Sequence, residues 1–272
     1  MVGKLAAFQI QNLLVAYKER FDKDNFIKNL LLDNLLLVDI YNRAKKLHIE
    51  NDQKRIVFLV EAKSKDNQML LETMKGMYAS GMKDFVTAVD ESSVILVKAL
   101  EETDGYREVY ESAKSIADTV SAEAMVNIRV SYGTIIHELK DVSKSYKEAG
   151  MALDVGRIFY PGHNILAYNE LGIGRLIHQL PLSLCDMFLK EVFGERDVSE
   201  FEEETLSTVY KFFENNLNIS ETARQLYIHR NTLVYRLEKI QKLTGLDVRV
   251  FEDALTFKIA MMVSEHMKYM NQ

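Results

Sequence analysis

The spacing of apolar residues predicts helices at both ends of the chain and a mixed α/β region between them. Near the start, Ile10, Tyr17 and Phe21 keep helical spacing. The charged run 18–23 separates this predicted helix from a second one at 26–47, which is leucine-rich on more than one face and must be buried from several sides. The first helix has no evident partner within the chain. We therefore predict that it forms a dimer interface or carries a signal from an upstream domain.

The middle region alternates short apolar runs with helical periods, which is typical of an α+β domain. We predict strands at 56–60, 85–89, 94–100, 124–132 and 164–168, with helices at 69–78, 104–120 and 139–159. Ser80 and Gly81 end the first of these helices, and the turn 90–93 joins two strands as a hairpin. This order predicts an antiparallel sheet of ferredoxin-like type with its helices on one face.

After Leu171 every predicted element is a helix. One begins at Pro181 and runs through 187–192, and the polar run 194–197 is a predicted linker. A supporting helix is predicted to bury Leu206, Val209, Tyr210, Phe213 and Leu217, and a closing helix at 253–270 to bury Leu255, Ile259 and Met262. These helices would form a second, all-helical domain.

Two short amphipathic segments in this region meet at a tight corner, 227–229. The first is predicted to bury Ile219, Ala223 and Leu226, and the second Leu233, Leu237 and Ile240. This phase turns Asn231, Tyr235 and Lys239 outward, with Arg230, Thr232 and Arg236 on the flanks. A short helix, a tight corner and a second helix with a polar and basic outer face are typical of a helix-turn-helix.

Charge distinguishes this segment from the rest of the chain. The 272 residues carry a net charge of −6, so the chain as a whole is not a general binder of polyanions. Residues 218–249 instead contain six Lys or Arg and three Asp or Glu, a net charge of +3. A local reversal of this kind in an acidic protein favours a DNA-facing module.

Several other classes of protein are disfavoured. Cys185 is the single cysteine and a predicted core residue, so no internal disulfide can form and a reducing cytoplasm is the expected location. The most apolar stretch, 30–40, is interrupted by Asp33, Asn34 and Asp39, which argues against a membrane span. The histidines, at positions 48, 137, 163, 178, 229 and 266, lack metal-ligand spacing. We expect neither a metal nor another cofactor.

The C-terminal run strongly resembles the PucR/CdaR family of bacterial transcriptional regulators. That family's hallmark is IHRNTLxYRLxxIxxLTG, which the chain matches from Ile228 to Leu237 and again at Ile240 and 243–245. The middle region, with its β-α-β-β-α-β order, resembles the degenerate GGDEF-like domain of the same family. Together the resemblance covers about residues 25–265. It implies a DNA-binding activator of a catabolic operon, of the sugar-diacid or purine type.

Seven residues of the second amphipathic segment are predicted to contact DNA. They are His229, Arg230, Asn231, Thr232, Tyr235, Arg236 and Lys239. Residues at the start of a recognition helix reach base edges, so Arg230 could pair with guanine and Asn231 with adenine.

The flanking cations Arg236 and Lys239, together with Arg224, are predicted phosphate contacts. Alternative roles remain open for three of the residues. His229 could cap the helix, Tyr235 could pack against the supporting helix, and Lys239 could belong to a solvated basic face.

The predicted organisation is N-terminal helices at 1–50 for linkage or dimerisation, a GGDEF-like domain at 51–170 and a helical domain at 171–272. The expected partners are double-stranded promoter DNA and further copies of the chain, in a dimer or higher oligomer, because a single helix-turn-helix binds weakly. A small-molecule effector is also possible. Family members of the sugar-diacid type carry a sensing domain ahead of these regions, and this sequence has no room for one. Either it is a fragment, or it senses another signal, or the signal enters through the first helix.

A nucleotide cyclase or other nucleotide-binding signalling protein is the alternative function that a GGDEF-type domain suggests. Such a site needs a glycine-lined turn for phosphates and acids for magnesium, whereas the turn at 89–93 offers Asp90 and Glu91 without paired glycines. Two adjacent acids in a turn are usually solvent-facing turn residues, so we predict that the chain is not an enzyme. A third possibility, compatible with DNA binding, is that the middle domain serves dimerisation alone.

Overall fold

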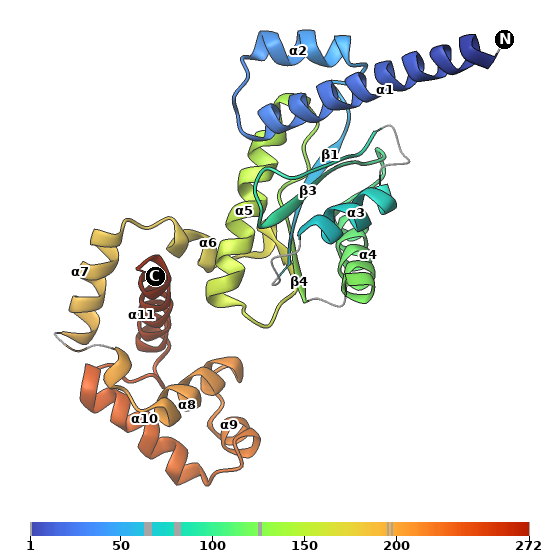
Figure 1. Cartoon of the computed structure of the whole chain (residues 1–272). Coiled ribbons are helices and arrows are strands. Elements are labelled where there is room, and N and C mark those ends of the chain that lie inside the picture. The colour runs from blue at the N-terminus through green and yellow to red at the C-terminus, as the bar shows by residue number, and fades with distance from the viewer. Residues whose placement is uncertain are drawn as a thin grey trace. The chain divides into compact units, whose positions relative to one another are not determined.

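The computed structural model describes residues 2–62, 67–78, 83–124, 127–194, 196 and 198–271; within these ranges the side chains of 2–10, 12, 13, 15–17, 124 and 199 are not described. Contacts within the chain divide it into two units, 1–172 and 173–272, both drawn in Figure 1. The predicted helix end at 80–81 and two linker residues, 195 and 197, lie outside the described residues.

A five-stranded sheet forms the centre of the first unit. Its strands are β1 (Arg55–Ala62), β2 (Phe85–Thr87), β3 (Ser93–Ala99), β4 (Ile128–Tyr132) and β5 (Ile165–Ala167), in the order β2-β3-β1-β4-β5. β1 lies between β3 and β4 and is antiparallel to both, as the ferredoxin-like prediction requires. β5 differs from the prediction because it is parallel to β4. Helix α5 (Val142–Phe159) supplies the crossover that a parallel pair of strands needs.

Helices cover both faces of this sheet, so the prediction of one covered face is wrong (Figure 1). Phe58 packs with α3 (Asn67–Tyr78) and α4 (Tyr106–Ala124). Its neighbours Val57 and Leu59 point to the opposite side and pack with α5 and the N-terminal helices. All three strand residues are buried. The continuous apolar run of β1 was the signal for two covered faces, because a strand with one solvated face alternates apolar and polar residues.

The boundary between the two N-terminal helices lies at a different place from the one predicted. α1 (Val2–Leu31) continues through the charged run 18–23, and α2 (Leu37–Lys46) follows a short turn. The charged run stays helical because its residues are good helix formers, and Glu19 forms an i,i+4 ion pair with Lys23. α1 ends instead at Leu31, and Asp33, two residues later, has a left-handed backbone with φ of +62°.

The elements described in the second unit are all helical. They are α6 (Ile173–His178), α7 (Leu182–Phe193), α8 (Glu203–Glu214), α9 (Ile219–Gln225), α10 (Arg230–Thr244) and α11 (Phe251–Met270). Short 3-10 helices lie at Leu139–Asp141 and Tyr168–Glu170 in the first unit and at Val198–Glu200 in the second. Phe212, Leu233 and Phe257 belong to the core of the second unit. Cys185 is fully buried in α7, as predicted.

The predicted buried face of the closing helix is wrong. In α11 the buried residues include Ala254, Phe257 and Ala260, whereas the predicted Leu255 is exposed. Because α11 is apolar around much of its circumference, leucine spacing alone did not fix its orientation. Small alanine side chains let the helix approach its neighbours closely, and they define the packed face.

Candidate nucleic-acid interface

Local capping sets the ends of α9 and α10. The Asn218 side chain accepts a hydrogen bond from the backbone N–H of Glu221 (3.0 Å) at the start of α9. At the start of α10 the Nδ1 atom of His229 accepts one from the backbone N–H of Asn231 (3.3 Å). Gly245, with φ of +79°, ends α10. The side chain of His229 therefore caps α10, which is the alternative role considered for it from the sequence.

The buried face of α10 is the predicted one. Leu233, Leu237 and Ile240 are buried in the core of the second unit. The opposite face begins with Arg230, Asn231 and Thr232, which are all exposed. Tyr235 is 62% exposed, so its ring does not pack into the supporting helix. The exposed start of α10 thus offers a guanidinium, an amide and a hydroxyl to solvent together.

The other predicted cations already hold carboxylate partners. Arg236 pairs with Glu204 (2.5 Å) and donates to Thr208 Oγ1 (3.0 Å), which leaves its side chain 16% exposed. Lys239 forms an ion pair with Glu202. Both acids precede or begin α8, so these contacts connect the recognition helix to its support. A DNA phosphate would therefore compete with a carboxylate for either cation.

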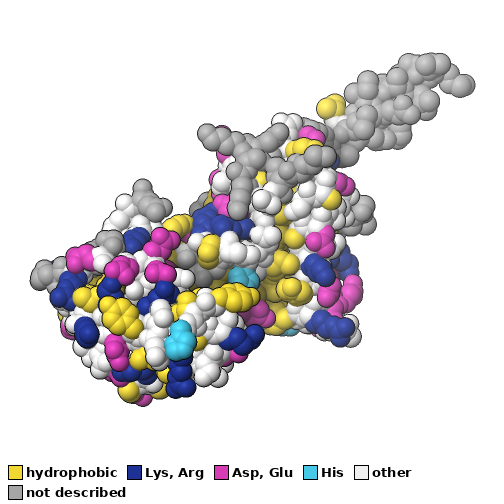
Figure 2. Space-filling model, turned by 90° about the horizontal axis from the view of Figure 1, so that it is seen from below, with side chains coloured by type: hydrophobic (Ala, Val, Ile, Leu, Met, Phe, Trp, Pro, Cys, Tyr) yellow, Lys and Arg dark blue, Asp and Glu magenta, His cyan; other side chains and the backbone are white. Residues whose placement is uncertain are grey.

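Arg224 in α9 is paired in the same way. Its Nη2 and Nε atoms contact the two carboxylate oxygens of Glu221 at 2.6 and 2.9 Å. The hydrogen bonds from Arg224 lower the pKa of Glu221 to about 2, so this acid stays ionised at neutral pH. On the face seen in Figure 2, basic side chains of the second unit are correspondingly interspersed with acidic ones.

Arg230 is the strongest candidate among the predicted contacts. It is exposed, and it has no ion-pair partner within the described part of the chain. It also lies in the first turn of α10, where free backbone N–H groups give a helix a partial positive charge. This combination favours contact with an anionic ligand at the start of α10.

The sequence analysis did not single out Tyr227, in the turn between α9 and α10. Its side chain is 96% exposed, and its backbone is left-handed with φ of +55°. An aromatic residue in the tight corner 227–229 was the available signal.

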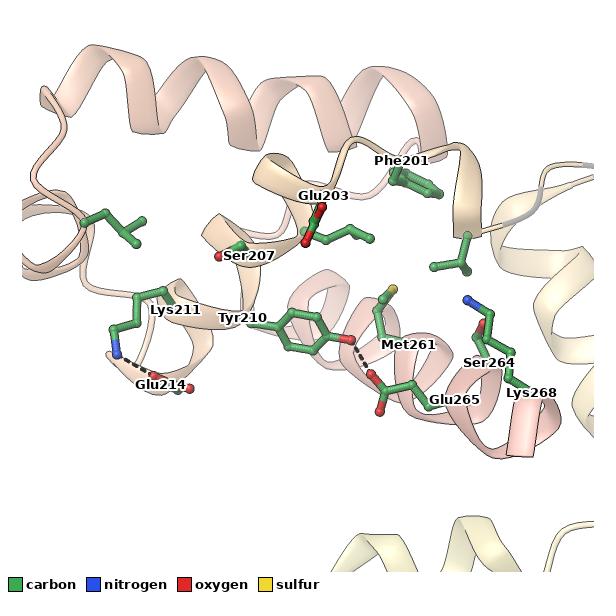
Figure 3. Close-up of a pocket in the computed structure, with 13 residues that line it drawn as sticks. Phe201, Glu203, Ser207, Tyr210, Lys211, Glu214, Met261, Ser264, Glu265 and Lys268 are labelled. Atoms are coloured by element: carbon green, nitrogen blue, oxygen red, sulfur yellow. Dashed lines mark hydrogen bonds and ion pairs between the residues drawn. The ribbon is translucent and has the colours of Figure 1, made fainter. Parts of the chain in front are cut away.

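A groove between α8 and α11 lies on another side of the second unit. It has a volume of about 710 Å3 and is lined by residues that include Leu206, Met261 and Tyr210 (Figure 3). Tyr210 was predicted to be buried, but it is partly exposed and donates a hydrogen bond to Glu265 (2.7 Å). Burial raises the pKa of the Glu265 carboxyl. The groove therefore contains a tyrosine–carboxyl pair within a lining of mixed apolar and charged residues.

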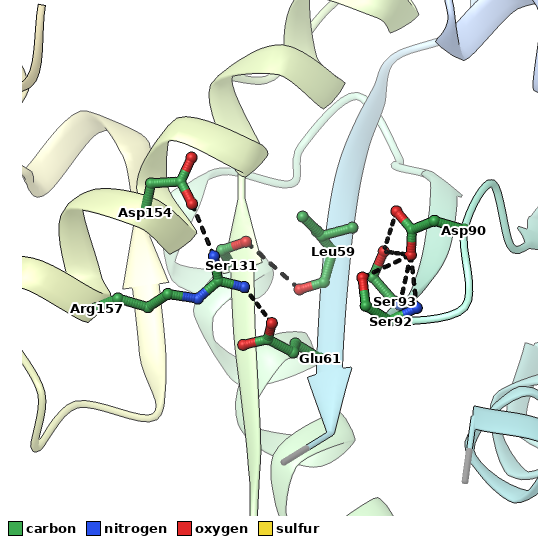
Figure 4. A network of polar contacts seen from close by, with 8 residues as sticks. All are labelled: Leu59, Glu61, Asp90, Ser92, Ser93, Ser131, Asp154 and Arg157. Carbon is green, nitrogen blue, oxygen red and sulfur yellow. Dashed lines mark hydrogen bonds and ion pairs between the residues drawn. The ribbon is translucent and has the colours of Figure 1, made fainter. Parts of the chain in front are cut away.

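Of the two acids considered for the cyclase alternative, Asp90 is engaged within its own turn and Glu91 is exposed. A third acid, Glu61, was not considered from the sequence. The carboxylate of Asp90 accepts hydrogen bonds from the backbone N–H groups of Ser92 (2.8 Å) and Ser93 (2.9 Å), which close the hairpin (Figure 4). These serine contacts lower the pKa of Asp90 although burial opposes the change. Glu61, at the end of β1, forms an ion pair with Arg157 of α5. Both carboxylates have structural partners within the unit.

Among the residues that the structure describes, no three His, Cys, Asp or Glu side chains gather as a metal site would require. None of the described helices combines the length and apolar character needed to cross a membrane.

Two family models match the chain. One, described as the PucR C-terminal helix-turn-helix domain, matches residues 205–263 and so includes α9 and α10. The other, a GGDEF-like domain, matches residues 34–155 and so includes β1 to β4.

Individual relatives are transcriptional regulators. The chain is 27% identical over 240 residues to the purine catabolism regulatory protein of Bacillus subtilis, a match to 82% of this chain and 45% of that protein. It is 25% identical over 231 residues to the carbohydrate diacid regulator of Escherichia coli, covering 82% and 60%. The DNA-binding transcriptional activator AdeR of Bacillus subtilis is 22% identical over 198 residues, covering 70% and 45%. The chain spans about half the length of these relatives.

Proposed function

Because the chain joins a GGDEF-like domain to a PucR C-terminal helix-turn-helix domain and so belongs to the PucR/CdaR family of transcriptional regulators, we propose that it binds promoter DNA through α10. The observation that carries this proposal is the exposed start of α10, where Arg230, Asn231 and Thr232 face solvent from a helix fixed by its buried leucines. The first turn of a recognition helix reaches base edges in the major groove.

The residues of this surface have different roles in the proposal. Arg230 and Asn231 read base edges, because a guanidinium can donate twice to guanine and an amide can pair with adenine. Thr232 and Tyr235 line the groove beside them. His229 supports the surface by capping α10. Arg236 and Lys239 contact phosphate in competition with their carboxylate partners.

Fluorescence anisotropy with labelled promoter DNA tests this proposal. The logarithm of the association constant of the intact chain should fall linearly with the logarithm of the salt concentration. Arg230→Ala should weaken binding to the matched site by about 1–3 kcal/mol and reduce discrimination against altered bases. The control is Lys242→Ala, which removes the same charge from an exposed position near the other end of α10. If the intact chain does not bind DNA at low salt, DNA binding through α10 is wrong.

The relatives support a proposal for the biological output. One is named as a regulator of purine catabolism and another as a carbohydrate diacid regulator. These names support the proposal that this chain activates a catabolic operon in the cytoplasm. A small-molecule effector would set its activity. Genome-wide mapping of bound promoters would identify the operon and so the class of effector. Binding confined to promoters unrelated to catabolism would contradict the catabolic assignment.

We also propose that two copies of the chain pair through α1. Leu14 and Phe21 are 64% and 57% exposed, and their separation of seven residues places them on one face of the helix. Farther along α1, Phe26 and Ile27 are buried in the first unit, which anchors the helix. Pairing would present two recognition helices to two half-sites.

The GGDEF-like domain is proposed to have no catalytic role. Asp90 closes its own turn and the nearby strand acid Glu61 pairs with Arg157, which supports this proposal. Glu91 is exposed in a turn that lacks the paired glycines a phosphate site needs. An assay with GTP or ATP and magnesium tests this, and accumulation of a cyclic or linear dinucleotide would contradict it.

A further inference from the structure

Tyr227 occupies a backbone position that usually favours glycine. The N–H of Ile228 donates to the carbonyl of Ala223 (3.1 Å), so Tyr227 is the left-handed residue that ends α9. A Cβ atom disfavours this conformation through contact with the backbone, and a bulky residue there is uncommon. Retaining a tyrosine at this position therefore carries a conformational cost.

The other left-handed residues show why Tyr227 is unusual. Of the described non-glycine residues with positive φ, Asp33, His48 and Asn216 are of types that tolerate this conformation. Leu217 is partly buried and packs against the core of the second unit, which supports its backbone. Tyr227 alone combines a bulky side chain with nearly complete exposure. No hydrogen bond to its hydroxyl is present within the described part of the chain.

We propose that Tyr227 contacts DNA directly: its hydroxyl donates to a backbone phosphate while its ring lies against the adjoining sugar. This inference rests on the proposed DNA binding by α10. Tyr227 lies three residues before Arg230, at the same end of the recognition helix. Tyrosine hydroxyls are among the groups that bind phosphate in protein–DNA complexes. The neighbouring cations Arg224 and Arg236 already hold carboxylates, so a neutral donor supplies a contact that they do not.

A neutral hydroxyl gives this contact a distinct signature. Replacing a lysine or arginine that binds phosphate lowers the salt slope of binding by about one, because one counterion fewer is released. Loss of a phenol hydroxyl should lower the affinity without changing that slope. Because phosphate carries no base identity, the loss should be equal on matched and unrelated sequences.

Two substitutions at Tyr227 separate the hydroxyl from the backbone effect. Tyr227→Phe should bind DNA about tenfold more weakly with the melting temperature unchanged, since only one hydrogen bond to a charged group is removed. Tyr227→Gly should melt at a higher temperature, because the left-handed strain is relieved, yet bind DNA more weakly. Greater stability with lower affinity is not the result expected of a residue with only a structural role.

His48→Gly is the matched control. His48 ends α2 with the same geometry, in which the N–H of Ile49 donates to the carbonyl of Ala44 (2.9 Å), and it belongs to the first unit. This variant should gain stability and keep its affinity. If the intact chain binds DNA but both Tyr227 variants bind equally well, or lower the salt slope by one, the Tyr227 contact is wrong. If the intact chain does not bind DNA, the proposed DNA binding through α10 is wrong.

Discussion

Individual carboxylates control how much positive charge α10 presents. Glu202 holds Lys239 and Glu204 holds Arg236, whereas the residue between them, Glu203, forms no ion pair with another described residue. The paired acids compete with DNA phosphate for the same cations. The unpaired acid affects DNA only through its general repulsion, which salt screens.

Removing the paired carboxylates should tighten DNA binding. Exposed ion pairs contribute about 0–1 kcal/mol each, so Glu202→Gln and Glu204→Gln should each raise affinity by up to about fivefold at low salt. Glu203→Gln, which removes the same charge from the same turn, is the control and should have a smaller effect. Anisotropy titrations of the three variants measure the difference. Equal gains in all three would show that only net charge matters.

At the scale of elements, the contact between α5 and β4 depends on one glycine. A Cβ atom added to Gly133 would lie 2.0 Å from the backbone oxygen of Ser145. The Ser145 hydroxyl accepts from the backbone N–H of Val57 (3.2 Å) and donates to the carbonyl of Thr134 (2.9 Å). Neither backbone can move away without breaking these hydrogen bonds. The close approach fixes α5 against the sheet.

Gly133→Ala should therefore destabilise the first unit by about 3 kcal/mol or more, or prevent folding. Gly150→Ala is the matched control, because a Cβ there meets nothing within 4 Å and the residue lies inside α5. It should stabilise the helix by about 0.5–1 kcal/mol. Urea unfolding followed by circular dichroism measures both changes. Similar stability for the two variants would contradict the tight contact.

The packing of α6 against α11 should be sensitive to acid. His266 is buried against His178, with ring centroids 5.4 Å apart, and their Nδ1 atoms lack hydrogen-bond partners in the described chain. Burial lowers the pKa of His266, and His178 lowers it further. The unfolded chain then binds a proton near pH 6.5 that the folded chain does not. Stability should fall as the pH drops below about 6.5.

Melting temperatures at pH 7.5 and 5.5 test this expectation. His266→Phe should lose less stability on acidification than the unmodified chain. His137→Gln, which changes an exposed histidine, should leave the pH dependence unaltered. If His266→Phe and the unmodified chain lose the same stability, another group is responsible.

These elements also show what the sequence could predict. Leu233, Leu237 and Ile240 gave the correct orientation of α10, because its opposite face is polar and only one face can be buried. The same reasoning failed for α11, whose apolar residues surround the helix. The carboxylate partners of Arg236 and Lys239 could not be predicted from the sequence either. Glu204 and Glu202 are more than thirty residues away, and only the fold brings them together.

At the scale of the whole molecule, DNA recognition depends on how many recognition helices one assembly carries. Deleting residues 1–50 would not test pairing through α1, because Phe26, Leu30 and Ala44 belong to the core of the first unit. Substitutions at exposed positions avoid this difficulty. α1 has 30 residues and a length of about 45 Å, and its first part carries the exposed Leu14 and Phe21.

The double variant Leu14→Lys, Phe21→Lys should convert a dimer into a monomer in sedimentation velocity, because two buried charges at one apolar seam would oppose pairing. Glu19→Lys is the control. It places a lysine about 140° around the helix from Leu14 and should sediment as the unmodified chain does. All these positions are exposed or partly exposed, so the melting temperature of the first unit should change little.

A monomeric double variant should also bind paired half-sites more weakly while keeping its affinity for a single half-site. If the double variant remains dimeric, the copies pair through another surface. The exposed apolar residues Leu36, Leu37 and Val38 at the start of α2 are then the next to replace.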